Sequence, residues 1–160
     1  MATIFFYGER NENGWLSNFY PAPITDSSGC KHQTTEHYFH YCKAVTFSDA
    51  KAAAAIMAAD TPLKAKRIGS KIKGYDDYIW GGLRRGVMRD ALRLKAQQHA
   101  HIADMLRGTG SALIAEAAQD DVIWGIGLDA ATAARTPRAQ WPGLNLLGDS
   151  WMAVRAELAA

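Results

Sequence analysis

Cysteine and long apolar runs are both scarce in this chain of 160 residues. With only Cys30 and Cys42, a disulfide-stabilised scaffold is excluded, and both thiols are expected to be reduced. No apolar run approaches the roughly 18 residues of a membrane-spanning helix. Residues 1–7 also lack the basic start and the long apolar stretch of a signal peptide. The sequence therefore predicts a cytoplasmic protein that does not interact with a membrane.

The scarcity of valine indicates the fold class. Only 4 residues are valine, whereas 28 are alanine. Because alanine favours helices and valine favours strands, an all-β fold is excluded. The length fits one domain, and neither an internal repeat nor a long linker divides the chain. We expect an α+β fold, namely a predominantly helical single domain over residues 1–160 with a small β-sheet.

Caps, turns and apolar spacing predict where the elements lie. Strands are predicted over residues 4–7, 112–116 and 123–127, with a hairpin turn at 26–29. Three helices are predicted in the first half, from Thr34 or Thr35 to Val45, from a cap at Ser48 to Asp60, and from Thr61 to Gly69. Three more are predicted from Asp76 or Asp77 past Leu94, over residues 99–107 and over residues 147–158.

The net charge of +2 hides an uneven distribution. Residues 64–95 hold ten basic and three acidic side chains, a net charge of +7, and the rest of the chain carries −5. A local positive field suits an anionic group such as a phosphate, and Arg67 and Arg84 are candidates to bind it. An ordinary solvated basic face is the alternative. The small total charge argues against tight, sequence-independent binding of long nucleic acid, but it allows a local contact with nucleic acid.

The stretch Glu36 to Lys43 carries the richest chemistry in the chain. On a helix, Glu36, His40 and Lys43 share one face, because they are spaced i, i+4, i+7. The helix dipole favours an ionised Glu36 in the first turn. Four other residues of this helix lie on roughly the opposite side and are expected to belong to the core: Tyr38, Tyr41, Cys42 and Val45. An ordinary polar helix face is the alternative interpretation.

A metal site is also conceivable in this region, where six potential ligands occur within 13 residues: Cys30, His32, Glu36, His37, His40 and Cys42. A zinc-binding helix needs two ligands at i, i+4 on one face, whereas His37 and His40 are three residues apart. No second ligand pair occurs downstream. We expect neither a metal nor another cofactor.

Asp121 and Trp124 form a second group of interest, just before a glycine. Trp124 and Trp80 are each either core residues or flat surfaces on which a base stacks. We expect stacking on a base for these two, and packing roles for Trp15, Trp141 and Trp151.

Several segments together resemble the YbiA-like, or NADAR, family of N-glycosidases. The matching pieces occur in family order over nearly the whole chain: Leu16–Tyr20, Thr35–Phe39, Lys43–Ala44, Trp80, Val87–Met88, Lys95, Glu116, Asp121–Gly127, Gly143–Gly148 and Met152–Arg155. Two positions depart from the pattern. His40 replaces the usual glutamine, and Ala96 replaces an aromatic residue.

The resemblance implies a YbiA-like fold and hydrolysis of a ribose–base N-glycosidic bond. The substrate is either a phosphorylated ribosylamino-pyrimidine of riboflavin synthesis or ADP-ribosylated guanine in nucleic acid. Glu36, Asp121 and Lys43 are then the catalytic candidates. The substrate-binding candidates are Asn18, His40, Arg67, Trp80, Arg84 and Trp124. A non-catalytic module that binds ADP-ribose or a nucleotide is the alternative, and the sequence does not indicate an oligomeric state.

Overall fold

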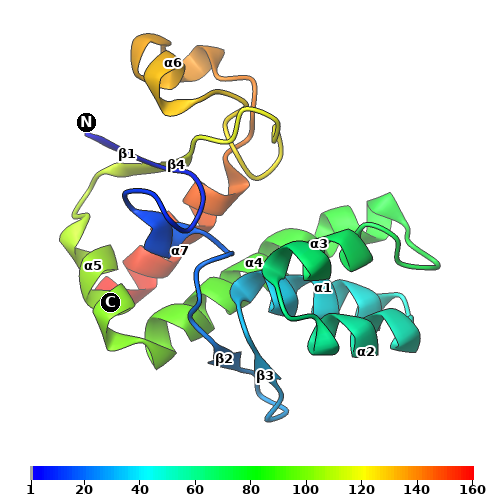
Figure 1. Cartoon of the computed structure of the whole chain (residues 1–160). Coiled ribbons are helices and arrows are strands. Elements are labelled where there is room, and N and C mark those ends of the chain that lie inside the picture. Colours follow the sequence, from blue (N-terminus) through cyan, green and yellow to red (C-terminus); the bar gives the residue numbers. More distant parts are fainter. Residues whose placement is uncertain (1) are drawn as a thin grey trace. The chain divides into compact units, whose positions relative to one another are not determined.

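A computed structural model describes residues 2–160, and helices dominate it (Figure 1). The α-helices are α1 (Thr35–Thr46), α2 (Ala50–Ala58), α3 (Pro62–Gly69), α4 (Asp77–Gln98), α5 (Ala100–Gly108), α6 (Ala130–Arg135) and α7 (Leu146–Ala159). The strands are β1 (Thr3–Phe6), β2 (Ile24–Thr25), β3 (Lys31–His32) and β4 (Leu113–Glu116), and short 3-10 helices span Gly14–Leu16 and Arg138–Gln140. The expected α+β class with a small sheet is confirmed. Among the residues described, no helix is both long and apolar enough to cross a membrane.

The chain divides into two compact units. Unit 1 contains the residues up to Ser17 together with Ala100–Ala160, and unit 2 contains Asn18–His99. The single domain expected over residues 1–160 stays a prediction.

Unit 1 is built on a parallel pair of strands. β1 pairs with β4 in the register Thr3↔Leu113 to Phe6↔Glu116, and α7 lies against β4 (Figure 1). The buried Trp151 of α7 donates its indole N–H to the carbonyl of Leu16 at 2.9 Å. This contact confirms the packing role expected for Trp151.

The strand predicted over residues 123–127 is wrong. One oxygen of Asp121, Oδ1, accepts hydrogen bonds from the backbone N–H groups of Ile123 (2.9 Å) and Trp124 (2.8 Å). A side chain that satisfies its own backbone in this way favours a turn over an extended strand. The apolar run Ile123 to Gly127 therefore forms a loop.

Unit 2 combines the hairpin β2–β3 with helices α1 to α4, and α1 contacts the other three helices. Thr34, Thr61 and Asp76 cap α1, α3 and α4 through their side chains, as expected. The predicted cap of α2 at Ser48 is wrong by one residue. Asp49 is the cap, because its Oδ1 accepts from Ala52 N in the first turn at 3.0 Å. Its other oxygen accepts from Lys73 N, outside the helix, at 2.9 Å.

The side of α1 that is buried differs from the expectation. Glu36 and His40 are buried together with Phe39 and Ala44. The four residues expected in the core are half-buried or exposed, and Val45 is 53% exposed. The polar face of α1 is thus the one covered by the protein, so its carboxylate and imidazole are shielded from bulk water.

A half-buried hydrogen bond joins the turn of the hairpin to β3. Asp26 Oδ2 lies 2.8 Å from Nε2 of the buried His32. Desolvation alone raises the pKa of Asp26, but hydrogen bonds from His32, Ser28 and Cys30 outweigh it and lower this pKa to about 2. The ionised carboxylate therefore stabilises the folded protein above its unfolded pKa, and this stabilisation is lost as the pH falls towards 2.

We expect Asp26→Asn to lower the free energy of unfolding by about 1 kcal/mol at pH 7. The difference from the parent protein shrinks as the pH falls through 4 towards 2, because Asp26 takes up a proton first in the unfolded chain and only near pH 2 in the folded protein. Urea unfolding at several pH values measures it. The control is Asp60→Asn, since Asp60 is exposed and pairs with Lys64 on the surface. We expect this substitution to change the free energy of unfolding very little. An Asp26→Asn effect that is the same at pH 3 and pH 7 would contradict the prediction.

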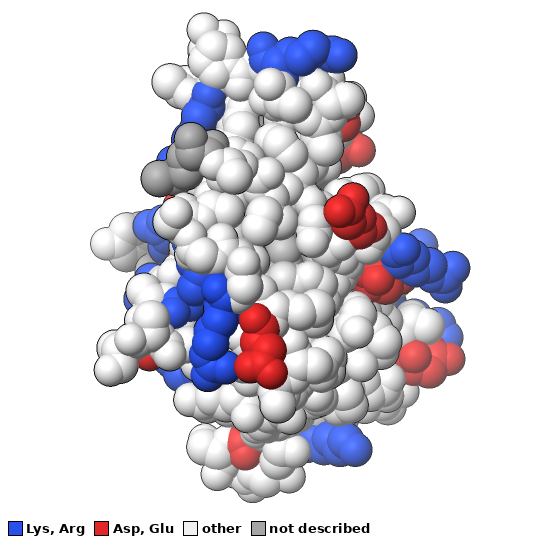
Figure 2. All heavy atoms as spheres, turned by 90° about the vertical axis from the view of Figure 1, so that its left-hand side faces the viewer, with Lys and Arg blue, Asp and Glu red and all other residues white. Residues whose placement is uncertain are grey.

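The distribution of surface charge matters for ligand binding. On the face in Figure 2, basic and acidic side chains are interspersed among uncharged residues. Within the segment 64–95, Lys64 pairs with Asp60 at 2.7 Å and Arg93 with Asp90 at 2.6 Å. Asp90 is already counted in the net charge of +7, and Asp60, which lies outside the segment, lowers the local charge by only one. The segment therefore stays basic, which suits an anionic group.

Candidate active site

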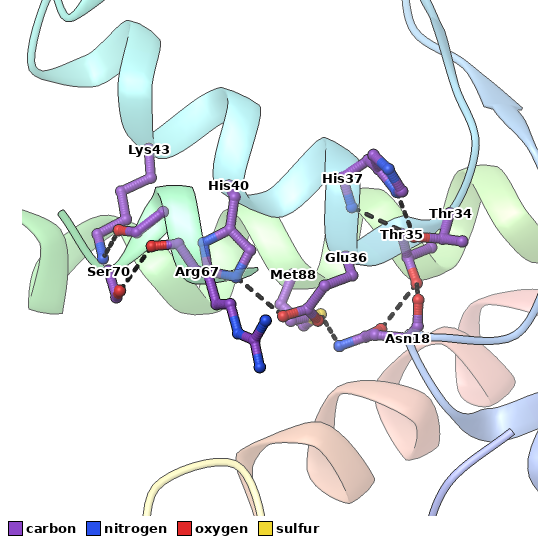
Figure 3. Close-up of polar contacts among 11 residues, drawn as sticks. Asn18, Thr34, Thr35, Glu36, His37, His40, Lys43, Arg67, Ser70 and Met88 are labelled. Carbon is purple, nitrogen blue, oxygen red and sulfur yellow. Dashed lines mark hydrogen bonds and ion pairs between the residues drawn. The ribbon is translucent and has the colours of Figure 1, made fainter. Parts of the chain in front are cut away.

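The first turn of α1 is anchored by Asn18. Its side-chain Oδ1 accepts a hydrogen bond from Thr35 Oγ1 at 2.8 Å, and its backbone carbonyl accepts from Glu36 N at 3.2 Å. Its Nδ2 donates to Met88 Sδ of α4 at 3.5 Å. The buried side chain of Asn18 therefore positions the start of α1, and with it Glu36 (Figure 3). The substrate contact expected for Asn18 stays a prediction.

Glu36 and His40 form a buried pair on α1. Glu36 Oε1 lies 2.8 Å from His40 Nε2, and the two residues are 8% and 7% exposed. Figure 3 shows the two side chains pointing towards each other along one side of the helix. The pair holds one carboxylate oxygen in a defined direction. A carboxylate that is oriented and shielded from water is suited to activate a water molecule or to stabilise a developing cation.

Lys43 lies at the other end of this face and contacts α3. Its ammonium group donates to the carbonyl of Gly69 at 2.9 Å and lies 4.5 Å from the centroid of the Tyr75 ring. Desolvation lowers the pKa of Lys43, and the nearby Asp77 partly opposes this shift. The predicted common face of Glu36, His40 and Lys43 is confirmed, with Lys43 bound to Gly69 and not to Glu36.

Arg67 and Arg84 lie on the two helices that flank this face. Arg67 is exposed in the last turn of α3, and its guanidinium group extends on the side of the Glu36–His40 pair (Figure 3). Arg84 is half-buried on α4, one turn before Met88 and on the same face. Its Nε is buried and forms no hydrogen bond with the residues that the structure describes. A buried N–H of this kind needs an acceptor, and a ligand oxygen can supply one.

Trp80 is a core residue in this structure, contrary to the expectation that it stacks on a base. Only 3% of it is exposed, and its ring packs edge-on against Phe39 (centroids 5.2 Å apart) and Phe47 (6.5 Å). The apolar spacing along α4 puts Trp80 on the buried face of the helix, where aromatic neighbours cover it. Its effect on the site is through packing beneath α1.

Asp121 and Trp124 belong to unit 1 and lie in the loop that follows β4. The backbone of this loop is bonded to the segment before α7 by a ladder of hydrogen bonds, including Leu144 N to Val122 O (2.9 Å) and Leu147 N to Trp124 O (3.1 Å). Asp121 Oδ1 caps the turn, and both Asp121 and Trp124 are half-buried. These two residues are thus held in one well-ordered loop, whereas the other predicted site residues belong to unit 2.

Lys95 is a charged residue in the interior of unit 2. It is fully buried on α4, and its ammonium group lies 5.3 Å from the centroid of the Tyr20 ring. Desolvation lowers the pKa of Lys95 to about 7. The sequence contained a signal for this burial, since Lys95 occupies the apolar face that includes Ala91 and Leu92.

The histidine, cysteine and acidic side chains near α1 do not form a metal site in the described part of the chain. Across residues 2–160, no group of three or more His, Cys, Asp or Glu side chains is arranged to hold a metal ion. His37 bonds the Ala59 carbonyl through Nε2 at 3.0 Å and Thr34 Oγ1 through Nδ1 at 2.8 Å. Both of its ring nitrogens are therefore used to attach α1 to its surroundings.

The comparisons with known proteins cover nearly the whole chain. The NADAR domain model matches residues 5–159. N-glycosidase R617 of Acanthamoeba polyphaga mimivirus is 30% identical, over 96% of this chain and 95% of that protein. Riboflavin biosynthesis protein VVA0006 of Vibrio vulnificus is 32% identical over 97% of this chain, which spans only 38% of that longer protein. The NMR structure of the Escherichia coli protein YbiA matches with a TM-score of 0.80 and 32% identity, over 99% of this chain and 85% of that one.

Proposed function

Because the chain belongs to the NADAR domain family, we propose that it hydrolyses an N-glycosidic bond between a ribose and a base. The observation that carries the proposal is the buried carboxylate of Glu36, which His40 holds at 2.8 Å on the covered face of α1. Relatives named N-glycosidase at about one-third identity support the same reaction.

The reaction requires a group that stabilises positive charge. Cleavage leaves electrons on the base nitrogen and oxocarbenium character on the ribose carbon, and water must then add to that carbon. We assign to Glu36 the activation of this water or the stabilisation of the sugar cation. Its low exposure strengthens both effects, because electrostatic interactions are stronger where bulk water is excluded.

Other groups are proposed to bind the rest of the substrate. Arg67 and Arg84 suit a phosphate, since guanidinium groups bind phosphate oxygens through paired N–H donors. We assign to Asp121 the positioning of the sugar or a share of the acid–base work, and to Trp124 stacking on the base. Such stacking contributes about 1–3 kcal/mol in other nucleotide-binding sites. Cys30 and Cys42 are free thiols, which suits the proposed cytoplasmic location.

Two substrates test the proposal directly. Incubation with a phosphorylated ribosylamino-pyrimidine, and separately with an ADP-ribosylated guanine oligonucleotide, is followed by mass spectrometry of the released base. We expect release from at least one substrate, and the faster reaction identifies the class. Binding of both without release of base would support the alternative, a module that binds ADP-ribose or a nucleotide without catalysis.

Lys43 carries a separate hypothesis. Attack of its neutral amine on the ribose carbon, with loss of the base and opening of the ring, would leave a Schiff base. The lowered pKa of Lys43 favours the required neutral form. Borohydride added during turnover is then expected to trap the sugar on Lys43. Peptide mapping identifies the modified lysine, and the exposed Lys71, which is expected to stay unmodified, is the control. An unmodified intact mass would count against the Schiff base and leave Lys43 with its contact to Gly69 or a role in binding phosphate.

A further inference from the structure

Gly69, at the end of α3, lies directly against the ring of His40. A Cβ atom at this position would overlap Nδ1 of His40 and come within 2.8 Å of its Cε1. Gly69 has no positive φ, so glycine is needed here for space and not for backbone conformation. The imidazole therefore rests on bare backbone and cannot shift towards α3.

The same glycine is held by a second residue of α1. Lys43 donates to its carbonyl at 2.9 Å, so the backbone that supports the His40 ring is itself tied to the helix that carries His40. The adjacent Phe39 ring lies at 82° to the imidazole, with centroids 5.3 Å apart. These contacts leave the ring one direction for a hydrogen bond, which is towards Glu36.

The hydrogen bonding indicates which ring nitrogen carries the proton. Nδ1 of His40 is buried and has no partner among the described residues, whereas Nε2 lies 2.8 Å from Glu36 Oε1. A buried N–H without an acceptor is rarer in proteins than an acceptor without a donor. The Nε2–H tautomer is therefore favoured, because its N–H donates to Glu36 and its Nδ1 is left with only an unpaired acceptor.

We propose that His40 and Gly69 are positioning residues, which hold the carboxylate of Glu36 in its reactive direction through the His40 ring. This proposal rests on the proposed function, and it replaces the earlier expectation that His40 contacts substrate. Gly69 acts only through His40, and His40 acts only through Glu36. Both residues therefore affect kcat and leave KM nearly unchanged.

Gly69→Ala is the first test, with Gly82→Ala as its matched control. Both glycines are helical, but a Cβ at the exposed Gly82 meets no atom within 4 Å. We expect Gly69→Ala to lower kcat about 10- to 100-fold with KM unchanged, as for a misplaced catalytic group, and Gly82→Ala to keep kcat. Equal kcat values for the two variants, with both folded by circular dichroism, would overturn the proposal.

A double-mutant cycle separates positioning from a general loss of structure. Once His40→Ala has removed the ring, the further change Gly69→Ala is expected to cost nothing more in kcat. His40→Gln, whose amide N–H can still donate to Glu36, is expected to recover most of the kcat that His40→Leu loses. Additive losses in the cycle, or equal kcat for the glutamine and leucine variants, would contradict the proposal.

A measurement without substrate keeps the inference distinct from the enzymatic assignment. Nitrogen-15 NMR of the histidine rings is expected to show His40 protonated at Nε2, with that N–H resonance displaced in Gly69→Ala and unchanged in Gly82→Ala. A neutral His40 ring that carries its proton on Nδ1 alone would overturn the positioning contact, because Nε2 could then not donate to Glu36. If no N-glycoside is hydrolysed, the proposed function fails, and this NMR result alone decides whether Gly69 orients His40.

Discussion

Glu36→Gln is expected to lower turnover about 100-fold or more while leaving the fold intact. Glutamine keeps the size of the side chain, and its amide oxygen can still accept the hydrogen bond from His40 Nε2. It can neither take a proton from water nor carry the negative charge that stabilises the sugar cation. The rate of base release under saturating substrate measures the effect, and circular dichroism with thermal unfolding verifies the fold.

A matched substitution controls for the loss of a negative charge. Glu12 is exposed in unit 1, and Glu12→Gln is expected to keep the turnover of the parent protein. If Glu36→Gln also retains near-normal turnover, Glu36 has no part in the chemistry and the proposed mechanism is wrong. A loss confined to KM would instead place Glu36 among the groups that bind substrate.

The sequence predicted the helical frame of unit 2 because its signals are local. Thr34, Thr61 and Asp76 cap helices through side chains that lie within three residues of the N–H groups they satisfy. The shared face of Glu36 and His40 likewise follows from the helical period alone. Caps and helical periods involve residues that are only a few positions apart, so they can be recognised without knowing the tertiary structure.

The remaining features depend on partners far away in the sequence. Whether Trp80 is covered depends on Phe39 and Phe47, and periodicity alone does not reveal which face of a helix another element covers. The contact of Gly69 with His40 joins residues on two helices, so no spacing rule predicts it. The polar face of α1 is buried for the same reason, because α2, α3 and α4 surround the helix.

Asn145→Ala is expected to cost the largest amount of stability. Asn145 is 5% exposed, and its side chain accepts from Glu116 N at 3.1 Å and donates to Ile114 O at 2.9 Å. Removing it leaves two backbone groups of β4 without these partners, at about 1–3 kcal/mol each. Asn145 also has a left-handed φ of 55°, which alanine adopts at a cost of about 1 kcal/mol.

We therefore expect Asn145→Ala to lower the free energy of unfolding by about 3 kcal/mol, measured by urea denaturation. Asn145→Gly loses the same hydrogen bonds but tolerates the left-handed backbone, so its cost should be about 1 kcal/mol smaller. Asn13 is a matched control, since it has a φ of 61° but forms only one longer bond, to Phe5 O at 3.2 Å. An Asn145→Ala variant no less stable than Asn13→Ala would show that these side-chain bonds do not hold α7 to β4.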